Sequence, residues 1–340
     1  MGRSGCALLF GAASSLFLLA GMVNAQTTYI EQGANGSWNT TTLWSPAGPP
    51  DGIDNTIGSI NPGGGRTITL DGNHTIGNIA FTINASRSYT INAGTPSTSV
   101  LTLQVSSGTP SVGVAAGATA GTLTIGAPVA GTQGLSKTGV GIFVLGGVNT
   151  FTGTASVSQG WLDINGSLAT GAPVLVSSGG NLAGKGTIND GVTLNSGGNI
   201  NPGDVFNNPI APQVGTLTAG SLTWNGGGKM AFQLGDPSLA ANSDQFILGG
   251  ALTEGTAGTF SFTFTQLTGF STSGTYTLMT FGSDSGFSAS DFSGAPTGME
   301  FDLTSTSLLL DPIPVPEPSM AALLAIGGLM AVRQIRRRKV

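Results

Sequence analysis

The only histidine in the chain, His74, is the residue that a serine hydrolase would need as its general base. It lies in the segment LDGNHTIGN, which is rich in turn-forming residues. No Gly-Xaa-Ser-Xaa-Gly nucleophile elbow accompanies it. We therefore expect His74 to be a turn residue at the surface rather than a catalytic base.

Three acidic residues are the candidates for polysaccharide cleavage, because glycoside hydrolysis uses two carboxyl groups about 5–9 Å apart. They are Asp163, Asp190 and Asp204, which fall in successive coils of the fold expected below. Asp163 alternates with Leu162 and Ile164 in an expected strand, and the other two lie in Gly-containing turns. We expect structural roles for all three, and a hydrolase or lyase remains the alternative.

Metal and cofactor chemistry has little support in the sequence. Asp51, Asp54 and Asn55 are the nearest approach to a calcium loop, but the dense Asp-Xaa-Asp-Xaa-Asp spacing is missing. The single cysteine, Cys6, lies in a segment that we expect to be removed. The glycine runs do not match a phosphate-binding loop. We predict no catalytic residues, no metal ligands and no cofactor.

Composition narrows the class of protein further. Charged residues make up only 8% of the 340-residue chain, and 56 residues are glycine. Five basic residues cluster at the C-terminus, so the rest of the chain is acidic. Without a basic stripe, nucleic-acid binding is excluded.

Residues 1–25 have the order of a secretory signal peptide. Arg3 precedes an apolar run at about residues 7–20, and small residues come before a cleavage point between Ala25 and Gln26. The apolar run is shorter than the roughly 20 residues that a membrane span needs. We expect a removable signal-peptide helix and export, with an N-terminal anchor as the alternative.

Residues 314–340 contain three parts in a fixed order. Alternating prolines favour an extended start, and an uncharged apolar run follows from Met320 to Val332. The last part is basic and, by the positive-inside rule, should stay in the cytoplasm; its residues are Arg333, Arg336, Arg337, Arg338 and Lys339. We expect one short C-terminal transmembrane helix that acts as a transient anchor.

The tail resembles the PEP-CTERM sorting signal, because its motif, apolar helix and basic end match in order. The motif consists of Val315, Pro316, Glu317, Pro318 and Ser319. The resemblance implies that an exosortase, an integral-membrane cysteine transpeptidase, cuts near this motif and passes the protein towards the surface or the exopolysaccharide matrix. An ordinary tail anchor is the alternative.

Residues 66–235 consist of short alternating apolar segments separated by Gly, Asn and Ser. Such segments predict strands of four to six residues, and they recur about every 20–25 residues. Coils of this size bury their apolar faces only by stacking on one another. The sequence therefore predicts an all-β protein, a right-handed parallel β-helix.

The segment from Leu135 to Gly166 resembles the autotransporter-associated β-helix repeat. The matching positions are Lys137, Thr138, Gly139, Leu145, Asn149, Thr150, Phe151, Thr152, Gly153, Val157, Gly160 and Leu162. The resemblance implies a passenger-type β-helix. Because one full repeat is present and no barrel segment follows, we expect export by another route than autotransport.

Both ends of the solenoid need caps, because an open coil leaves strand edges unpaired. We assign residues 26–65, which contain Trp38 and Trp44, to an N-terminal cap. An exposed tryptophan pair that stacks on sugars is the alternative. Residues 236–313 hold most of the phenylalanines and predict a C-terminal β cap or small sandwich, antiparallel in part.

Together these features predict an exported, surface-sorted, non-enzymatic β-helix protein. We expect it to serve as a structural or adhesive component of the cell envelope or the exopolysaccharide matrix. Its expected partners are the exosortase, the membrane that holds the tail transiently, and exopolysaccharide. A polysaccharide-active enzyme and a carbohydrate-binding surface protein are the alternatives.

Overall fold

The computed structural model describes residues 26–60, 65–83, 88–116, 121–205 and 213–314. The predicted signal peptide, which ends at Ala25, lies outside these residues, as do the sorting motif from Val315 and the basic tail. Across the described part of the chain, no helix has the length and apolar character to cross a membrane.

The described residues form two sheets and three short 3₁₀ helices, so the all-β prediction is confirmed. The smaller sheet contains β2 (Gly36–Ser37), β5 (Arg66–Leu70), β7 (Ser88–Ala93), β10 (Thr122–Ile125), β13 (Ile142–Leu145), β16 (Gly160–Ile164), β19 (Gly180–Gly184), β21 (Asn199–Pro202), β23 (Lys229–Leu234), β26 (Phe260–Gln266) and β29 (Phe292–Ser293).

The larger sheet contains β1 (Thr28–Glu31), β3 (Trp44–Ser45), β4 (Gly52–Ile60), β6 (His74–Ile83), β8 (Leu101–Leu103), β9 (Ser111–Ala116), β11 (Val129–Ala130), β12 (Leu135–Thr138), β14 (Val148–Asn149), β15 (Ala155–Val157), β17 (Ser167–Leu168), β18 (Val174–Val176), β20 (Thr187–Leu194), β22 (Thr216–Trp224), β24 (Gln245–Leu248), β25 (Ala251–Glu254), β27 (Tyr276–Thr280), β28 (Ser283–Ser285), β30 (Met299–Leu303) and β31 (Ser307–Pro312). The 3₁₀ helices are η1 (Thr41–Leu43), η2 (Ala240–Asn242) and η3 (Ala289–Asp291).

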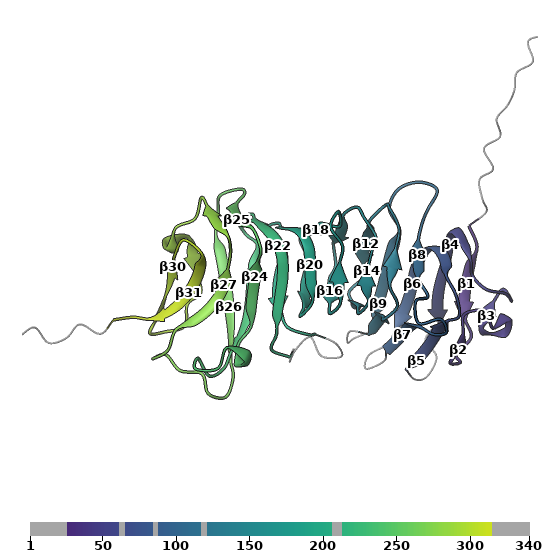
Figure 1. The fold of residues 1–340 in the computed structure, drawn as a ribbon, viewed down its shortest axis with the longest axis horizontal. Coiled ribbons are helices and arrows are strands. Elements are labelled where there is room, and N and C mark those ends of the chain that lie inside the picture. The colour runs from purple at the N-terminus through teal and green to yellow at the C-terminus, as the bar shows by residue number, and fades with distance from the viewer. Residues whose placement is uncertain (1–25, 61–64, 84–87, 117–120, 206–212, 315–340) are drawn as a thin grey trace, which may run out of the picture.

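The chain winds between the two sheets, and each turn pairs in parallel with the turn before it. In the middle of the molecule β13 pairs with β16, β14 with β17 and β15 with β18, all in parallel. The coils stack along the long axis, with the purple N-terminal coils and the yellow C-terminal coils at opposite ends (Figure 1). This arrangement is that of a parallel β-helix.

An apolar ladder through the smaller sheet explains why the coils stack. Leu123 pairs with Phe143, which pairs with Leu162, then Leu182 and then Ile200, and all five side chains are fully buried. Burying one such side chain contributes about 1.5–3 kcal/mol. The apolar face of each coil therefore lies between equivalent faces of its two neighbours.

Coil length varies along the axis. The coils from Leu123 to Ile200 contain about 20 residues each, as the repeat spacing predicts. The next ladder partners, Met230 and Phe262, are about 30 residues apart, so the coils near the C-terminal end are longer.

Parallel pairing also continues across the predicted cap boundaries. Towards the N-terminus β1 pairs with β4 and β2 with β5, and towards the C-terminus β26 pairs with β29. Among the named strands, antiparallel pairing is confined to the ends, where β1 pairs with β3, and β31 pairs with β27 and β30. Much of both predicted caps therefore consists of further solenoid coils.

The C-terminal end of the core is filled by aromatic rings. Trp224 makes edge contacts with Phe260 and Phe262, at centroid distances of 5.3 and 5.4 Å. Phe287 and Phe292 stack at 5.3 Å, and Phe301 lies 5.1 Å from Phe262. Large rings fill the wider interior of the longer coils, and the β30–β31 hairpin then covers the edge of β27.

Candidate functional site

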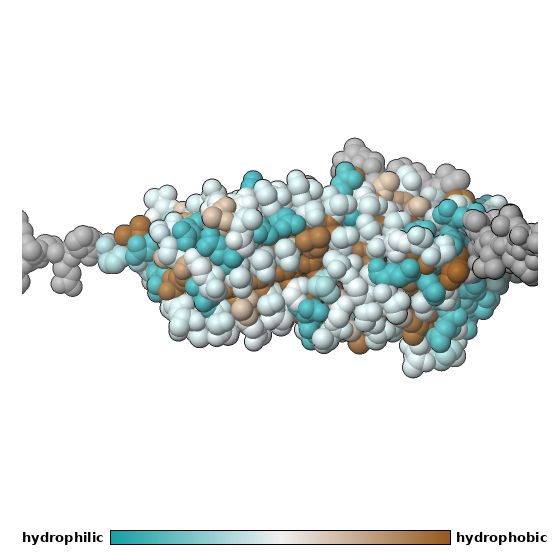
Figure 2. All heavy atoms as spheres, turned by 90° about the horizontal axis from the view of Figure 1, so that it is seen from above, coloured by the Kyte–Doolittle hydropathy of each residue, from teal (hydrophilic) through white to brown (hydrophobic). Residues whose placement is uncertain are grey.

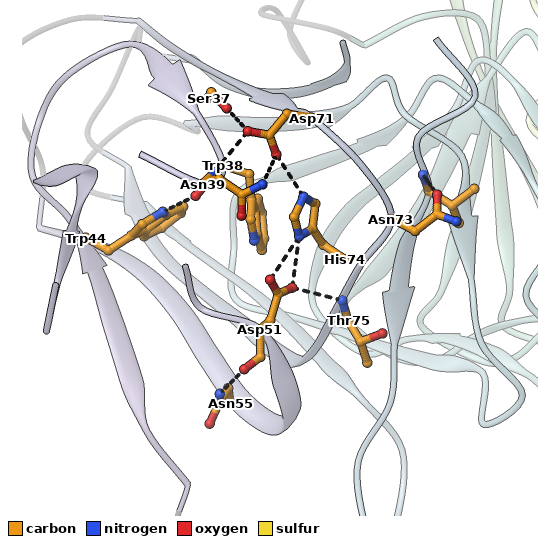
Figure 3. Close-up of polar contacts among 11 residues, drawn as sticks. Ser37, Trp38, Asn39, Trp44, Asp51, Asn55, Asp71, Asn73, His74 and Thr75 are labelled. Carbon is orange, nitrogen blue, oxygen red and sulfur yellow. Dashed lines mark hydrogen bonds and ion pairs between the residues drawn. The ribbon is translucent and has the colours of Figure 1, made fainter. Parts of the chain in front are cut away.

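His74 is not the surface turn residue that the sequence predicts. It is the first residue of β6, and only 6% of it is exposed. Its ring lies between two carboxylates, with Nδ1 3.0 Å from both oxygens of Asp51 and Nε2 3.0 Å from Oδ1 of Asp71 (Figure 3). The prediction is wrong because the register of β6 draws this residue inside the N-terminal coils.

The arrangement around His74 does not match a nucleophile–base–acid chain. Ionised carboxylates only accept hydrogen bonds, so the two neighbours are satisfied together when both ring nitrogens carry a proton. The nearby hydroxyl of Ser37 donates to Asp71 and not to the imidazole (Figure 3). Among the described residues, both ring nitrogens contact carboxylates, and through them His74 links the segments that carry Asp51 and Asp71.

Asp71 is the organising acceptor of this cluster. It receives hydrogen bonds from Ser37, from His74 and from the backbone and side-chain amides of Asn39. Partial burial raises the pKa of Asp71, but the hydrogen bonds outweigh it and hold the pKa below its ordinary value. The carboxylate is therefore ionised at neutral pH and joins the segment after β2 to the start of β6.

The tryptophans of the N-terminal coils are buried, so they do not form a sugar-stacking platform. Trp38 is 0% and Trp44 2% exposed, and their rings meet edge to face at 5.3 Å. The His74 ring stacks on Trp38 at 5.1 Å, and the indole N–H of Trp44 donates to the Trp38 carbonyl (Figure 3). Carbohydrate binding through this pair is excluded, because both faces of the platform are covered.

The residues nearest to a calcium loop point to different partners. Asp54 Oδ1 accepts a hydrogen bond from the Ser106 amide at 2.7 Å, and the Asn55 side chain donates to the Asp51 carbonyl at 2.9 Å. Asp51 itself binds His74. Within the described ranges, no group of three or more His, Cys, Asp or Glu side chains is arranged to hold a metal ion.

The structure brings together two of the three candidate carboxylates. Asp163 and Asp204 interact directly, whereas Asp190 lies in β20 of the other sheet and accepts a hydrogen bond from the Gly171 amide. Burial, together with the neighbouring Asp204 carboxylate, raises the pKa of Asp163 to about 8. Asp163 is 0% exposed, so the pair does not lie in an open groove of the kind that a polysaccharide chain needs.

Lys185 completes this cluster, although no motif in the sequence marks it. Its Nζ lies 3.4 Å from Oδ2 of Asp204. Gly184 and Gly203, the residues just before these two, form an antiparallel bridge between successive coils. Only the coil register would have revealed this neighbourhood, because the two residues lie in separate turns of the sequence.

Lys137 and Asn149, both in the repeat motif, are buried corner residues. The Nζ of Lys137 donates to the carbonyls of Thr138, Gly139 and Gln159 at 2.7–3.1 Å, and burial lowers the pKa of Lys137 to about 7. The Asn149 amide accepts a hydrogen bond from Val129 and donates to two carbonyls. Both side chains join neighbouring coils and therefore have structural roles.

The outer surface is mostly of intermediate hydropathy, with scattered hydrophilic groups and an apolar band along the long axis (Figure 2). Large apolar side chains that are well exposed in the described ranges are few and dispersed; they are Val140, Val148, Leu239 and Ile313. Two shallow hollows of about 400 and 810 Å³ lie at the C-terminal end, around η3. Neither is lined by His74, Asp163, Asp190 or Asp204.

Comparison with known proteins links the chain to an adhesin. No family model matches the sequence. In an alignment of 211 residues that covers 59% of the chain, the sequence is 31% identical to the adhesin BmaC autotransporter of Brucella suis biovar 1 (strain 1330). The matched region spans only 5% of that much longer protein. The chain is thus similar to part of an autotransporter adhesin, in agreement with the autotransporter-type repeat in its sequence.

Proposed function

We propose that this protein is an exported, non-enzymatic β-helix that is displayed at the cell surface as an adhesive or structural element of the envelope or the exopolysaccharide matrix. The observation that carries the proposal is the end-to-end parallel ladder, considered together with the similarity to an autotransporter adhesin. In a stacked solenoid each coil packs only against its neighbours, so a narrow apolar core supports a long lateral surface.

The rod-like body suits a spacer or contact surface. Its backbone hydrogen bonds run between coils along the axis, so the stack resists bending as a unit. In this proposal the coils wind to the right, as parallel crossover connections almost always do. Few charges interrupt the flanks, and the many Ser, Thr, Asn and Gly residues offer hydrogen bonds to a hydrated polysaccharide.

The sorting half of the proposal depends on the two ends of the sequence. The signal peptide directs export, and the apolar run at Met320–Val332 holds the protein in the membrane. An exosortase-type transpeptidase then cuts near Val315–Ser319, and the released body moves to the surface or the matrix. The basic residues from Arg333 to Lys339 remain on the cytoplasmic side.

Fractionation of the native host tests this route. The full chain is compared with a chain that lacks residues 314–340 and with the substitution Glu317→Ala. We expect the full chain at the surface or in the medium without its basic tail, and the two altered forms misplaced. Surface protein that still carries Arg336–Val340 would overturn the sorting model.

Adhesion and catalysis are separated by a second experiment. Purified protein immobilised on beads is mixed with the host exopolysaccharide, and both the bound polysaccharide and newly formed chain ends are measured. We expect binding without cleavage. Release of new reducing or unsaturated ends would instead support the polysaccharide-active enzyme.

A further inference from the structure

Lys185, Asp204 and Asp163 form a cluster whose chemistry the proposed function does not use. The Lys185 ammonium and the Asp204 carboxylate form an ion pair, with Nζ 3.4 Å from Oδ2. The Asp163 carboxyl interacts with Asp204, so the electrophilic carbon of Asp204 lies between an amine and a second carboxyl group.

The backbone fixes the position of each partner. Gly184 and Gly203 exchange two hydrogen bonds of 2.8 and 2.9 Å, and these bonds place Lys185 and Asp204 next to each other on successive coils. Asp204 also exchanges two hydrogen bonds with Gln213, at 2.9 and 3.0 Å. The Val205 amide donates to Oδ2 of Asp163 at 3.0 Å.

A glycine is required at the first of these positions. Gly184 has a φ of +127°, and a Cβ placed there would lie 2.1 Å from the Ile164 carbonyl oxygen. A side chain would therefore push the turn away from the coil beneath it. Gly184 therefore allows the chain to turn at the end of β19, which places Lys185 beside Asp204 on the next coil.

The surroundings of Asp163 exclude water. The residue is 0% exposed, and it lies beside a buried apolar cluster of Ile142, Val144, Ala183 and Val205. Its Oδ1 atom is buried and has no hydrogen-bond partner among the described residues. Burial and the Asp204 charge raise the pKa of Asp163 to about 8, so this carboxyl group holds its proton at neutral pH.

We propose that Lys185 and Asp204 join in an intramolecular isopeptide bond, with the Asp163 carboxyl group transferring the protons. The inference rests on the geometry of the three side chains and is independent of the proposed surface role. A buried acid with one unpaired oxygen beside a lysine–aspartate pair is costly if it serves structure alone, and the proposed reaction gives the acid a chemical role.

The reaction balances as a condensation. The Lys185 ammonium passes one proton to an oxygen of the Asp204 carboxylate across the ion pair. The nitrogen lone pair of the resulting amine attacks Cγ of Asp204 and a new N–C bond forms. Asp163 donates its proton to the Asp204 oxygen that received the first proton, the C–O bond breaks, and this oxygen leaves as water. The nitrogen gives up its second proton to restore neutral Asp163, so the net change is the loss of one water and of one charge pair.

The three side chains differ in solvent exposure, which falls from Lys185 through Asp204 to Asp163. Lys185 reaches the site from solvent, with 46% of its side chain exposed. The Asp204 side chain is 15% exposed, and Asp163 is fully buried. Holding amine and carboxyl in contact replaces an encounter in solution with a local step, which is worth a large effective concentration.

The bond would lie next to the antiparallel bridge that Asp204 forms with Gln213. A covalent link from Lys185 to Asp204 would tie the coil of β19 to the coil of β21. In a rod that carries load along its axis, such a link would stop these coils from separating at this point.

Trypsin provides a direct test with the full chain. Between Lys137 and Lys229 the sequence has one tryptic site, Lys185. An amide on its Nζ blocks cleavage there, so we expect a single peptide of residues 138–229 that is lighter than its sequence mass by one water. Fragmentation should place the link between Lys185 and Asp204.

Matched variants separate the roles of the three residues. Lys185→Arg retains the charge and the tryptic site but not the reactive amine, and Asp204→Ala removes the electrophile, so both should give two peptides of full mass. Asp163→Asn retains the shape and should slow bond formation at least tenfold. Asp190→Asn, which changes a carboxylate on the other sheet, should form the bond as the native chain does.

The opposite results are equally clear. A native chain that is cut at Lys185 into two peptides of full mass, after folding and prolonged incubation at neutral pH, would overturn the proposal. A bond that forms equally fast in Asp163→Asn would overturn the role of Asp163. Neither result depends on where the protein is sorted or on what it binds.

Discussion

Buried polar side chains in this molecule connect coils. His74 joins Asp51 to Asp71, Lys137 joins three carbonyls at a corner, and Asn149 bonds to backbone groups on both sides. Each satisfies backbone or carboxylate groups that a narrow solenoid would otherwise leave unpaired at its turns. At the scale of single residues, these titratable and polar side chains therefore stabilise the contacts between coils.

The replacement His74→Ala tests this role in the N-terminal coils. It leaves two carboxylates without their shared donor and opens a cavity against Trp38, so we expect a loss of about 2–3 kcal/mol in the free energy of unfolding. Urea denaturation followed by tryptophan fluorescence measures the change.

Asn73→Ala is the control for this replacement, because Asn73 precedes His74 and accepts an exposed hydrogen bond from the Val100 amide. It should cost about 0.5 kcal/mol. Equal losses in the two variants would contradict the special role of His74.

The buried Asp163 carboxyl predicts a particular pH dependence. Its pKa rises from 3.8 to about 8, so the folded protein holds a proton that the unfolded chain releases. The contribution of this group to the free energy of unfolding is fully present below about pH 4 and is lost as the pH rises to about 8. The slope of this loss is no steeper than about 1.4 kcal/mol per pH unit.

Urea midpoints at pH 5 and pH 8 for the native chain and Asp163→Asn check this dependence. The native chain should lose more stability between the two values than the variant, which has no proton to release. The buried Asp244, whose pKa burial raises to about 7, contributes to both proteins and drops out of the comparison. Parallel pH profiles would rule out the effect.

At the scale of elements, strand alternation separates the core from the surface. Ile200 in β21 faces inward, pairs with Leu182 and Met230, and is fully buried. Its neighbour Asn199 faces outward and pairs with Asn181 and Lys229. One strand therefore supplies both a core position and a matched surface position.

Paired replacements in β21 measure the contribution of the ladder. Ile200→Ala should lower the free energy of unfolding by about 2–5 kcal/mol, because the cavity lies between two rigid coils. Asn199→Ala should change it by less than about 0.5 kcal/mol. The same urea denaturation reports both, and a larger loss from Asn199→Ala would contradict the inward register.

At the scale of the whole molecule, the capping of the two ends determines whether the protein remains a monomer. The β30–β31 hairpin pairs antiparallel with β27 and covers an edge that parallel stacking would otherwise extend. Uncovered strand edges pair with other chains. The C-terminal hairpin therefore both ends the ladder and protects it.

Truncation tests the cap. A chain that ends at Gly298 lacks the hairpin and should form larger assemblies, whereas one that ends at Ile313 retains it and should be monodisperse. Size-exclusion chromatography with light scattering distinguishes the two. A monodisperse chain ending at Gly298 would show that the hairpin is dispensable for protecting the edge.

The sequence by itself determined the class of fold and its repeating unit. Alternating apolar segments at a short spacing leave stacking as the way to bury them, so the solenoid and its core positions, such as Leu145 and Leu162, follow from local pattern. The signal peptide and the sorting tail lie outside the described residues and stay predictions from the sequence pattern.

Only the tertiary structure decided which residues meet across coils. The register brings His74 between Asp51 and Asp71, buries both Trp38 and Trp44, and sets Lys185 beside Asp204. Sequence spacing does not specify such contacts, because coil length varies from about 20 to about 30 residues along the axis. A shift of one residue in β6 or β3 would move His74 or Trp44 to the opposite face of its strand.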